Sequence, residues 1–496
     1  MQNLTHFING QHSQESDKKL IVENPATREI IGHVSLASEK ETNEAVNVAH
    51  KALNNWSATP ANKRTQILFK FKQAVEANKN NLAKLLTTEH GKTLEDSMGE
   101  VQRGIEVIDF ACGIPHLLKG EYTDNVGSGV DSWSIFQPLG VVAGITPFNF
   151  PIMVPLWMIP IAIASGNTFI LKPSEKDPSG PLKLAELLSD SGLPDGVLNV
   201  INGDKVAVDT LLTNKLVQAI SFVGSTPVAE KIYQTGCQHG KRVQALGGAK
   251  NHMIVMPDAD LDQAVNSIIG SAYGSAGERC MAISVVVAVG GVADEIINKL
   301  IPKIKEIKIG NGLDKDTEMG PIISQTQLEK IKNYIQKGID SGAKLIIDGR
   351  TIKTKDNTKG FFIGGSLFDF VTEEMSIYQE EIFGPVLCIV RAPDYKSALN
   401  LINKHEFGNG TAIFTRDGDS ARQFSQDVQI GMVGINVPIP VPMAFHSFGG
   451  WKRSLFGPLN MHGEDGVRFY TKRKTITSRW PTGIRENPEF VIPTMK

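Results

Sequence analysis

The chain has 496 residues, of which 41 % are hydrophobic and 21 % charged, so it can bury a large core and is not disordered as a whole. Its 51 basic and 53 acidic side chains give a formal net charge of −2, which excludes the strongly basic surface of a dedicated nucleic-acid-binding protein. The four cysteines lie far apart without a CxxC pair, so we expect neither a disulfide framework nor a metal site.

The amino-terminal segment has neither the basic region nor the apolar run of a secretory signal. The uncharged stretch from Ser132 to Leu171 is long enough to span a bilayer, but prolines interrupt it every four or five residues between Pro147 and Pro160. Such spacing favours a buried strand, a loop and a short helix over a spanning helix. We therefore expect a cytoplasmic protein that does not enter a membrane.

Apolar side chains recur at helical spacing over residues 61–90, which predicts one long helix. Beyond residue 140, short apolar runs alternate with segments of helix length. The expected strands are 141–145, 168–172, 197–201 and 218–223, and the expected helices are 152–164, 178–191, 204–213 and 226–238. Alternation of this kind predicts βαβ units and a mostly parallel sheet, whose ligands bind at the carboxyl ends of the strands.

The alternation starts again near residue 250, with a strand at 252–256 and a helix at 260–273. A second α/β unit is therefore expected over residues 247–445. Residues 119–137 and 467–490 alternate polar with β-branched or aromatic side chains, a pattern typical of strands. These two segments are predicted to form a protruding β-flap or a strand pair at an oligomer interface.

Several common catalytic motifs are absent from the sequence. There is no GxGxxG fingerprint, no HExxH and no GxSxG, and Gly91-Lys92-Thr93 lacks the first glycine of a phosphate-binding loop. Kinase, metalloprotease and serine-hydrolase functions therefore have no support from motifs.

Five local strings stand at the ends of predicted strands or in turns. They are Gly277-Glu278-Arg279-Cys280, Thr146-Pro147-Phe148-Asn149-Phe150-Pro151, Leu171-Lys172-Pro173-Ser174-Glu175, Phe222-Val223-Gly224-Ser225-Thr226 and Glu380-Glu381-Ile382-Phe383-Gly384-Pro385-Val386. Each could serve an ordinary purpose alone, such as a turn, a helix cap or a solvated loop.

Cys280 differs from the other three cysteines because it follows two charged residues at a glycine-containing turn. Such a position can be exposed, and the adjacent Arg279 is expected to favour the thiolate. Cys112, Cys237 and Cys388 are expected to be small buried hydrophobic side chains. The start of the segment after residue 224 could hold a phosphate on backbone amides, and Lys172 and Glu175 could reach a ribose.

In this order and spacing, the five strings resemble the aldehyde dehydrogenase superfamily, and the resemblance covers essentially the whole chain. It implies an α/β fold with a variant Rossmann domain that binds NAD, an α/β catalytic domain and a small β oligomerisation flap. The implied boundaries are 1–118 and 138–246 for the NAD-binding domain, 247–445 for the catalytic domain, and 119–137 with 467–490 for the flap. A homotetramer is implied, and a dimer stays open.

The resemblance also implies roles for individual residues. Cys280 matches the nucleophile of the family, and Asn149 matches the amide that stabilises the oxyanion. The residues that match cofactor-binding positions are Phe148, Lys172, Glu175, Gly224, Ser225, Glu381 and Phe383. The charge of Glu175 favours NAD over NADP, because it would repel a 2′-phosphate.

One position departs from the family pattern. Ala245, in the string Gln244-Ala245-Leu246-Gly247-Gly248, stands where most members carry the Glu that activates water to hydrolyse the acyl-enzyme. A methyl group cannot accept a proton, so hydrolysis should be slow. A long-lived acyl-enzyme favours a thiol such as coenzyme A as the acceptor, although an inactive relative would carry the same change.

The strings at 99–106, 245–252, 277–284 and 445–452 resemble the CoA-acylating branch that oxidises methylmalonate semialdehyde. In that branch two arginines hold the substrate carboxylate, and they match Arg103 and Arg279. A guanidinium binds a carboxylate through two parallel hydrogen bonds, which suits an acid semialdehyde. The resemblance implies conversion of methylmalonate or malonate semialdehyde to propionyl-CoA or acetyl-CoA, as in valine breakdown. A hydrolytic aldehyde dehydrogenase and a non-catalytic protein of the same fold are the alternatives.

Overall fold

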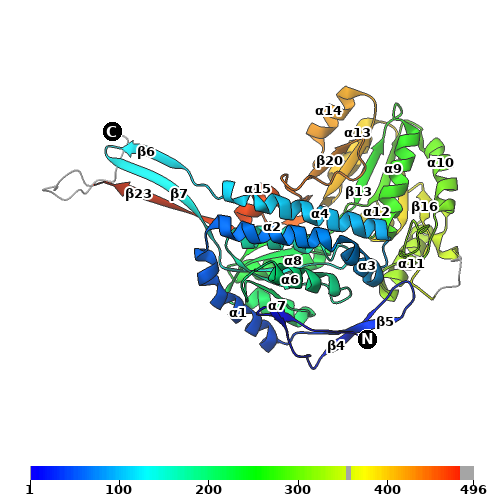
Figure 1. Ribbon diagram of the computed structural model, residues 1–496. Helices are drawn as coiled ribbons and strands as arrows, with labels where there is room; N and C mark the ends of the chain where they lie inside the picture. The colour runs from blue at the N-terminus through cyan, green and yellow to red at the C-terminus, as the bar shows by residue number, and fades with distance from the viewer. Residues whose placement is uncertain (1, 353–358, 481–496) are drawn as a thin grey trace.

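Strands and helices alternate along most of the chain, and the structure, a computed structural model, describes residues 2–352 and 359–480. Within these residues the strands form two large sheets, of eight and seven strands, together with three small sheets. The two large sheets belong to two neighbouring α/β units, from which a long β-arm extends (Figure 1). The expected α/β class is confirmed.

The first large sheet has five parallel strands at its centre and antiparallel strands at both edges. Its order is β22 (Leu455–Phe456), β12 (Arg242–Leu246), β11 (Val217–Val223), β8 (Val141–Ile145), β9 (Thr168–Lys172), β10 (Leu198–Val200), β2 (Phe7–Ile8) and β3 (Gln11–His12). All four strands predicted for this unit are present: β8 and β9 have the predicted bounds, β11 begins one residue earlier, and β10 is one residue shorter at each end.

Helices cover both faces of this sheet. On one face lie α2 (Ala61–Ala77), α3 (Lys79–His90), α4 (Leu94–Cys112), α5 (Met153–Ala164) and α6 (Ser179–Asp190), and on the other α1 (Glu39–Ala58), α7 (Lys205–Thr213) and α8 (Thr226–Gln238). α5 is buried along its whole length, which explains the uncharged sequence around it. In the described part of the chain, no helix is both long and apolar enough to cross a bilayer.

The prediction of a single helix over residues 61–90 is wrong, because the chain forms two helices that meet at Asn78. The Asn78 side chain donates a hydrogen bond of 2.8 Å to the carbonyl oxygen of Ala74 in the last turn of α2. An asparagine that bonds the backbone in this way competes with continuation of the helix. The apolar side chains keep helical spacing across Asn78, so the periodicity of the sequence showed no sign of the break.

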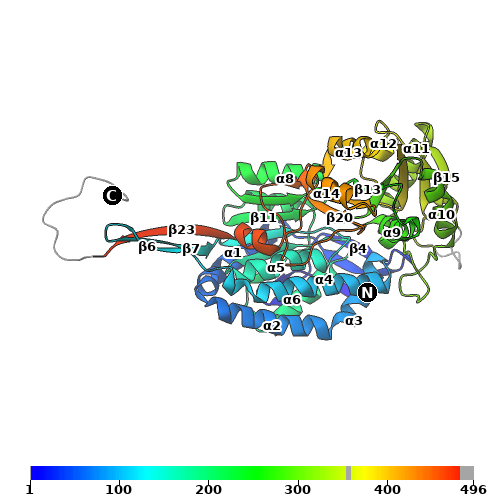
Figure 2. The ribbon, with the colours of Figure 1, turned by 90° about the horizontal axis from the view of Figure 1, so that it is seen from above.

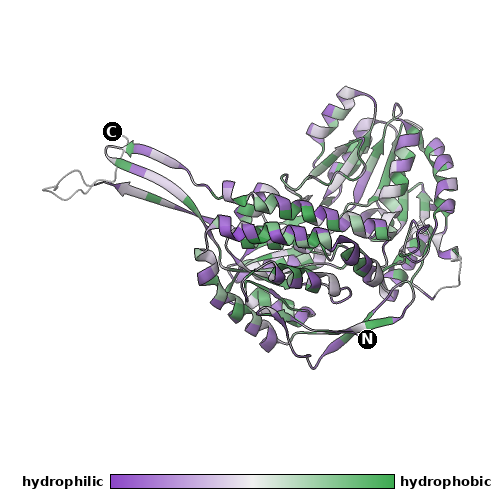
Figure 3. Cartoon of the chain, in the orientation of Figure 1, coloured by the Kyte–Doolittle hydropathy of each residue, from purple (hydrophilic) through white to green (hydrophobic). Residues whose placement is uncertain are grey.

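The second large sheet has six parallel strands and one antiparallel edge strand, β15. Its order is β15 (Lys344–Ile347), β16 (Ser366–Asp369), β17 (Val386–Ala392), β14 (Ile283–Val289), β13 (Asn251–Val255), β19 (Gly410–Phe414) and β20 (Met432–Ile435). The accompanying helices are α9 (Leu261–Tyr273), α10 (Ala293–Glu306), α11 (Gln325–Asp340), α12 (Ser376–Gln379), α13 (Tyr395–Lys404) and α14 (Gly418–Asp427). Figure 3 shows apolar strands inside and polar residues on the outer helix surfaces.

The β-arm consists of β6 (Tyr122–Gly127), β7 (Val130–Pro138) and β23 (Thr471–Arg479), paired antiparallel, and it projects away from both α/β units (Figures 1 and 2). The predicted protruding flap is therefore present. Its second segment begins later than predicted, because residues 467–469 belong to α15 (Gly463–Phe469). Residues 481–490 of that segment lie outside the described residues.

The remaining strands are short. A small sheet near the amino terminus contains β1 (Gln2–Leu4), β5 (Ile30–Ser35) and β4 (Lys19–Glu23), and β18 (Phe407–Gly408) pairs with β21 (Trp451–Lys452). In residues 2–352 and 359–480, three 3-10 turns cover Ile114–His116, Gly274–Gly277 and Gly349–Thr351. The second of these turns leads into Cys280.

Candidate active site

A cavity of about 320 Å³ lies between α4, α5, the loop that precedes β14 and the segment 439–448. Cys280, Arg103 and Arg279 all line it. Its apolar wall includes Trp157 of α5 and Val441. The cavity therefore brings together a thiol, two cations and apolar surface, although the three predicted residues are far apart in sequence.

The loop that carries Cys280 reverses sharply. Ser275, Ala276 and Gly277 have φ angles of 52°, 52° and 72°, so three successive residues adopt the left-handed conformation. A side chain at Gly277 would place its Cβ atom 2.4 Å from the carbonyl oxygen of Gly384. Gly277 is therefore required both for the turn and for the close approach of the loop to Gly384.

Two amides that the sequence analysis did not single out fix the backbone of Cys280. The side chains of Asn251 and Asn409 donate hydrogen bonds of 2.9 Å and 3.0 Å to its carbonyl oxygen. Asn251 begins β13, and Asn409 directly precedes β19. The only sequence signal that could have indicated this role is an Asn at the end of a strand.

The thiol of Cys280 is held in its neutral form. Burial raises the pKa of Cys280 to about 12, and the negative charge of Glu381 raises it further, whereas Arg279 lowers it only slightly. Arg279 therefore favours the thiolate, as expected, but burial and Glu381 outweigh its effect. The reason is geometric, because the Arg279 guanidinium forms an ion pair with Asp96.

The other cysteines differ from the expectation at one position. Cys112 and Cys388 are buried, as predicted, but Cys237 is exposed on α8. All four cysteines carry free thiols. In the described ranges, 2–352 and 359–480, no cluster of three or more His, Cys, Asp or Glu side chains could hold a metal ion.

Asn149 lies beside the nucleophile loop, just after β8. Its side-chain amide donates a hydrogen bond of 3.1 Å to the carbonyl oxygen of Glu278, two residues before Cys280. A carboxamide carries two N–H groups, so one remains for an oxyanion formed on substrate. The structure thus brings Asn149 to the loop of Cys280.

A buried ion pair between Lys92 and Glu100 packs against the backbone of Asn149. The Nζ of Lys92 lies 2.7 Å from a carboxylate oxygen of Glu100 and donates a second hydrogen bond of 2.5 Å to the carbonyl oxygen of Asn149. The other Glu100 oxygen accepts hydrogen bonds from the backbone N–H groups of Ile152 and Met153. The pair therefore fixes the backbone at Asn149 and just after it.

Arg103 reaches the cavity from α4. It pairs with Glu106 at 2.6 Å and also donates to the carbonyl oxygen of Pro442. Arg279 and Arg103 are both partly exposed, so their N–H groups are reachable from the cavity. A dicarboxylic semialdehyde would exchange part of these contacts for its own carboxylate.

The predicted cofactor residues cluster at the carboxyl ends of β9 and β11. Lys172 and Glu175 form an ion pair of 3.1 Å at the end of β9, with Glu175 partly exposed. Ser225 caps α8 without using its side chain, and it is exposed, as Gly224 partly is. The exposed start of α8 suits a phosphate, and the neighbouring Lys172–Glu175 pair suits a ribose. These residues fit a dinucleotide.

Phe148 and Phe383 meet next to this region. Their rings pack edge to face with centroids 5.9 Å apart, and Lys176 lies 5.4 Å above the Phe148 ring. Phe383 has a φ of 56°, a conformation that is uncommon for a bulky residue. This strained position holds its ring against Phe148.

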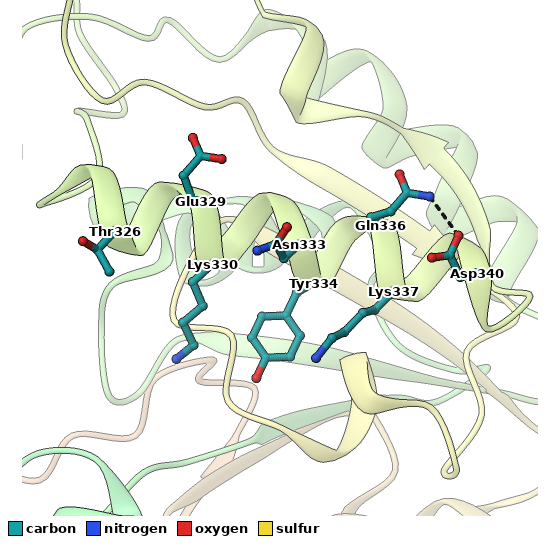
Figure 4. Close-up of a pocket in the computed structure, with 8 residues that line it drawn as sticks. All are labelled: Thr326, Glu329, Lys330, Asn333, Tyr334, Gln336, Lys337 and Asp340. Atoms are coloured by element: carbon teal, nitrogen blue, oxygen red, sulfur yellow. Dashed lines mark hydrogen bonds between the residues drawn. The ribbon is translucent and has the colours of Figure 1, made fainter.

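Glu381 lies in the same loop, which is fixed by α11. Gln327 of α11 donates to the carbonyl oxygens of Ile382 and Phe383, and the Tyr334 hydroxyl donates a hydrogen bond of 2.5 Å to Glu380. Figure 4 shows Lys330, Tyr334 and Lys337 extending from the same side of α11. Lys330 lowers the pKa of Glu381, but burial dominates and raises it to about 7.

Ala245 does not line the cavity of Cys280. It is fully buried in β12, where it packs in the apolar layer formed with β8, β11, α1, α7 and α8. The sequence comparison alone did not show which face of the strand this side chain occupies. No carboxylate stands at this position, as the sequence indicates.

The aldehyde dehydrogenase family model matches residues 12–476 of the chain. The chain belongs to the aldehyde dehydrogenase family. It is 58 % identical to a malonate-semialdehyde dehydrogenase of Pseudomonas aeruginosa, with all of both chains covered. It is 52 % identical to the enzyme of the same name from Halalkalibacterium halodurans, over 96 % of this chain and 98 % of that one.

Solved structures of relatives show that this aldehyde dehydrogenase has the fold of its family. The crystal structure of methylmalonate-semialdehyde dehydrogenase from Oceanimonas doudoroffii matches with a TM-score of 0.96 at 56 % identity, covering 97 % and 99 % of the two chains. A Sinorhizobium meliloti protein assigned to the same enzyme class and crystallised with NAD also gives 0.96, at 55 % identity and 98 % and 99 % coverage.

Proposed function

We propose that this aldehyde dehydrogenase converts malonate semialdehyde, or its methyl-branched homologue, to acetyl-CoA or propionyl-CoA with NAD as oxidant. The observation that carries the proposal is the placement of Arg103 and Arg279 in one cavity with Cys280. An aldehyde whose other end is a carboxylate can be bound by the arginines while Cys280 reaches its carbonyl carbon. The names of the relatives above support the same substrate class.

The chain's own residues account for the first half of the reaction. The Cys280 thiol gives its proton to solvent as its sulfur attacks the aldehyde carbon, and the free N–H of the Asn149 amide donates to the oxyanion that forms. NAD, when bound, accepts a hydride from that carbon. Lys172, Glu175, Ser225 and Glu381 are the residues that would hold it. An acyl thioester on Cys280 remains.

The substrate carboxylate lies β to the thioester carbonyl, so its C–C bond can break to release CO₂. The electron pair moves onto the thioester oxygen, where the Asn149 amide again donates a hydrogen bond. Protonation of the resulting enolate gives an acetyl or propionyl thioester. Coenzyme A then takes the acyl group from Cys280.

Product analysis tests the proposal directly. Malonate semialdehyde is oxidised with NAD, with and without coenzyme A, and the products are identified by mass spectrometry. Acetyl-CoA that forms only with coenzyme A, together with slow NADH release in its absence, is the expected result. Free acid at the same rate in both cases would show that the enzyme is hydrolytic.

We also propose a homotetramer in which the β-arm contacts other subunits, and the reducing cytoplasm as its location. The arm carries exposed Tyr122, Ile135 and Trp480 although it projects from the body of the chain. Exposed apolar side chains on a projecting sheet favour burial against a second subunit. Free thiols at all four cysteines fit the reducing compartment.

A further inference from the structure

We propose that Glu381 transfers the proton during acyl transfer to coenzyme A, taking it from the coenzyme A thiol and returning it to the Cys280 sulfur. This role goes beyond binding of the cofactor ribose and rests on the CoA-acylating function proposed above. The position of Glu381 relative to Cys280, the engagement of the other carboxylates and the chemistry of the step each support it.

Glu381 and Cys280 lie on two loops that touch. Gly277 of the nucleophile loop is packed against the carbonyl of Gly384, three residues after Glu381. On its other side, the Glu381 carboxylate lies so close to Gly248 that a Cβ atom there would be 2.4 Å from Oε2. The negative charge of Glu381 raises the pKa of the Cys280 thiol. The two touching loops therefore hold the carboxylate within electrostatic range of the reacting sulfur.

One oxygen of this carboxylate is free to take a proton. Oε1 accepts a hydrogen bond of 3.0 Å from the backbone N–H of Ala249, and no described residue donates to Oε2. The charged groups that face Glu381 are Lys330 of α11 and Lys250, which follows β12, together with the Tyr334 hydroxyl and Cys280. The Lys250 ammonium donates to the Glu380 carbonyl, so it is engaged elsewhere.

Of the other carboxylates near the cavity, Glu95 is exposed to solvent at the start of α4, and the remaining three are occupied. Glu100 pairs with Lys92 and accepts two backbone N–H groups. Asp96 pairs with Arg279. Glu278 is fully buried, and its carboxylate accepts the backbone N–H of Ile323.

The proposed step balances in atoms and charge. The Glu381 carboxylate removes the proton of the coenzyme A thiol as its sulfur bonds to the acyl carbon of the Cys280 thioester. The tetrahedral oxyanion is stabilised by the Asn149 amide, and it collapses with breakage of the bond between the acyl carbon and the Cys280 sulfur. The Glu381 carboxylic acid then protonates that sulfur. The net change is transfer of the acyl group from one thiol to another, without oxidation or reduction.

The electrostatics of the two groups agree with this role. A carboxyl whose pKa is about 7 is close to the operating pH of a general base, and Glu381 meets this condition because of its burial. The Cys280 thiolate, whose pKa is raised to about 12, is a poor leaving group unless it is protonated as it departs. A single carboxyl that alternates between base and acid serves both ends of the step.

The test separates this role from cofactor binding, since it uses no NAD. Cys280 is acylated with p-nitrophenyl propionate, and intact-mass spectrometry measures the fraction of acyl-enzyme. Coenzyme A is then added, and the rate of propionyl-CoA formation per acyl-enzyme is followed between pH 5.5 and 9. Wild type is compared with Glu381→Gln and with the control Glu374→Gln, which removes an exposed carboxylate seven residues before Glu381.

In wild type, the transfer rate should rise with pH through about 7 as Glu381 ionises. Glu381→Gln should transfer about 100-fold more slowly and lose this step in the pH profile. Glu374→Gln should stay within about twofold of wild type. A Glu381→Gln acyl-enzyme that transfers at the wild-type rate with the wild-type pH profile would overturn the inference.

A second measurement covers the case in which the variant does not load from the ester. Exchange of isotopically labelled coenzyme A into propionyl-CoA requires only the transfer step and its reverse, and the same 100-fold loss is expected. If wild-type acyl-enzyme passes its acyl group to water and not to coenzyme A, the proposed function itself fails. Rapid transfer by both wild type and variant would refute only the role of Glu381.

Discussion

Lys92 and Glu100 form a fully enclosed ion pair of 2.7 Å directly beneath the backbone of Asn149. Removing one partner of such a pair leaves a buried charge without compensation. We expect Lys92→Met to lower the free energy of unfolding by about 3–5 kcal/mol, and the double change Lys92→Met with Glu100→Gln to recover part of the loss. Urea unfolding of wild type, Lys92→Met, Glu100→Gln and the double variant measures this coupling. Additive losses would show that the pair does not act as a unit.

The two arginines of the cavity should discriminate between substrates. Arg279→Leu and Arg103→Leu each remove charged hydrogen bonds worth about 1.5–3 kcal/mol, so KM for malonate semialdehyde should rise about 10- to 100-fold. KM for propionaldehyde, which has no carboxylate, should change far less. Steady-state kinetics with both aldehydes make the comparison, with exposed Arg422→Leu as control. Equal effects on the two aldehydes would remove these arginines from substrate binding.

Iodoacetamide should label Cys280 slowly near neutral pH. Burial and the charge of Glu381 raise the pKa of this thiol to about 12, so the rate should keep increasing with pH through 10 without a plateau. Glu381→Gln removes the negative charge and should lower the thiol pKa, which speeds labelling at pH 8. Peptide mass spectrometry follows Cys280, with exposed Cys237 as internal reference. A plateau near pH 8 in wild type would contradict this electrostatic description.

Glu89 should make folding stability depend on pH below neutrality. Burial raises the pKa of Glu89 to about 7 in the folded chain, from 4.5 in its ordinary state, although Ser179 donates two hydrogen bonds to it. Between pH 4.5 and 7 the unfolded chain therefore loses a proton that the folded chain keeps. The contribution of Glu89 to the free energy of unfolding therefore falls by about 3 kcal/mol as the pH rises across that interval.

Glu89→Gln should remove that slope, and urea unfolding at pH 4.5, 5.5 and 7 measures it. The same measurements on Glu175→Gln, a partly exposed carboxylate, provide the control. If wild type and Glu89→Gln show the same pH dependence, another group titrates in this range. Buried Asp177, whose pKa burial also raises, is the first candidate.

The β-arm should govern assembly. Ile135 is 38 % exposed on β7, so Ile135→Asp places a charge on a surface that we expect to be buried between subunits. The variant should shift from a tetramer to smaller species in mass photometry. Ser128→Asp, at the exposed tip of the same hairpin, is the matched control and should leave the assembly unchanged. A wild-type monomer would contradict the proposed assembly.

The strands were the most predictable part of the fold. β8 and β9 are short, fully buried apolar runs bounded by turn residues, so the sequence defines both of their ends. The break at Asn78 was not predictable from periodicity, since it depends on a single side chain bonding the preceding turn. Helical spacing continues on both sides of that break.

The site was predictable only where one residue carries its own signal. Cys280 and Asn149 stand in strings that resemble a known family, and the structure places them on adjacent loops. The partner of Arg279 could not be foreseen, because Asp96 is 183 residues away and meets it only after the two α/β units pack together. The weak effect of Arg279 on the Cys280 thiol follows from that same long-range contact.

The close contact between Gly277 and Gly384, called the seam here, limits how this enzyme could be redesigned. Any side chain at Gly277 would strike the opposite backbone, so the loops bearing Cys280 and Glu381 cannot be varied independently. A library aimed at new aldehydes would lose most of its members if it included this position. Diversity belongs instead at Ile439 and Val441, which line the far wall of the cavity and leave the seam intact.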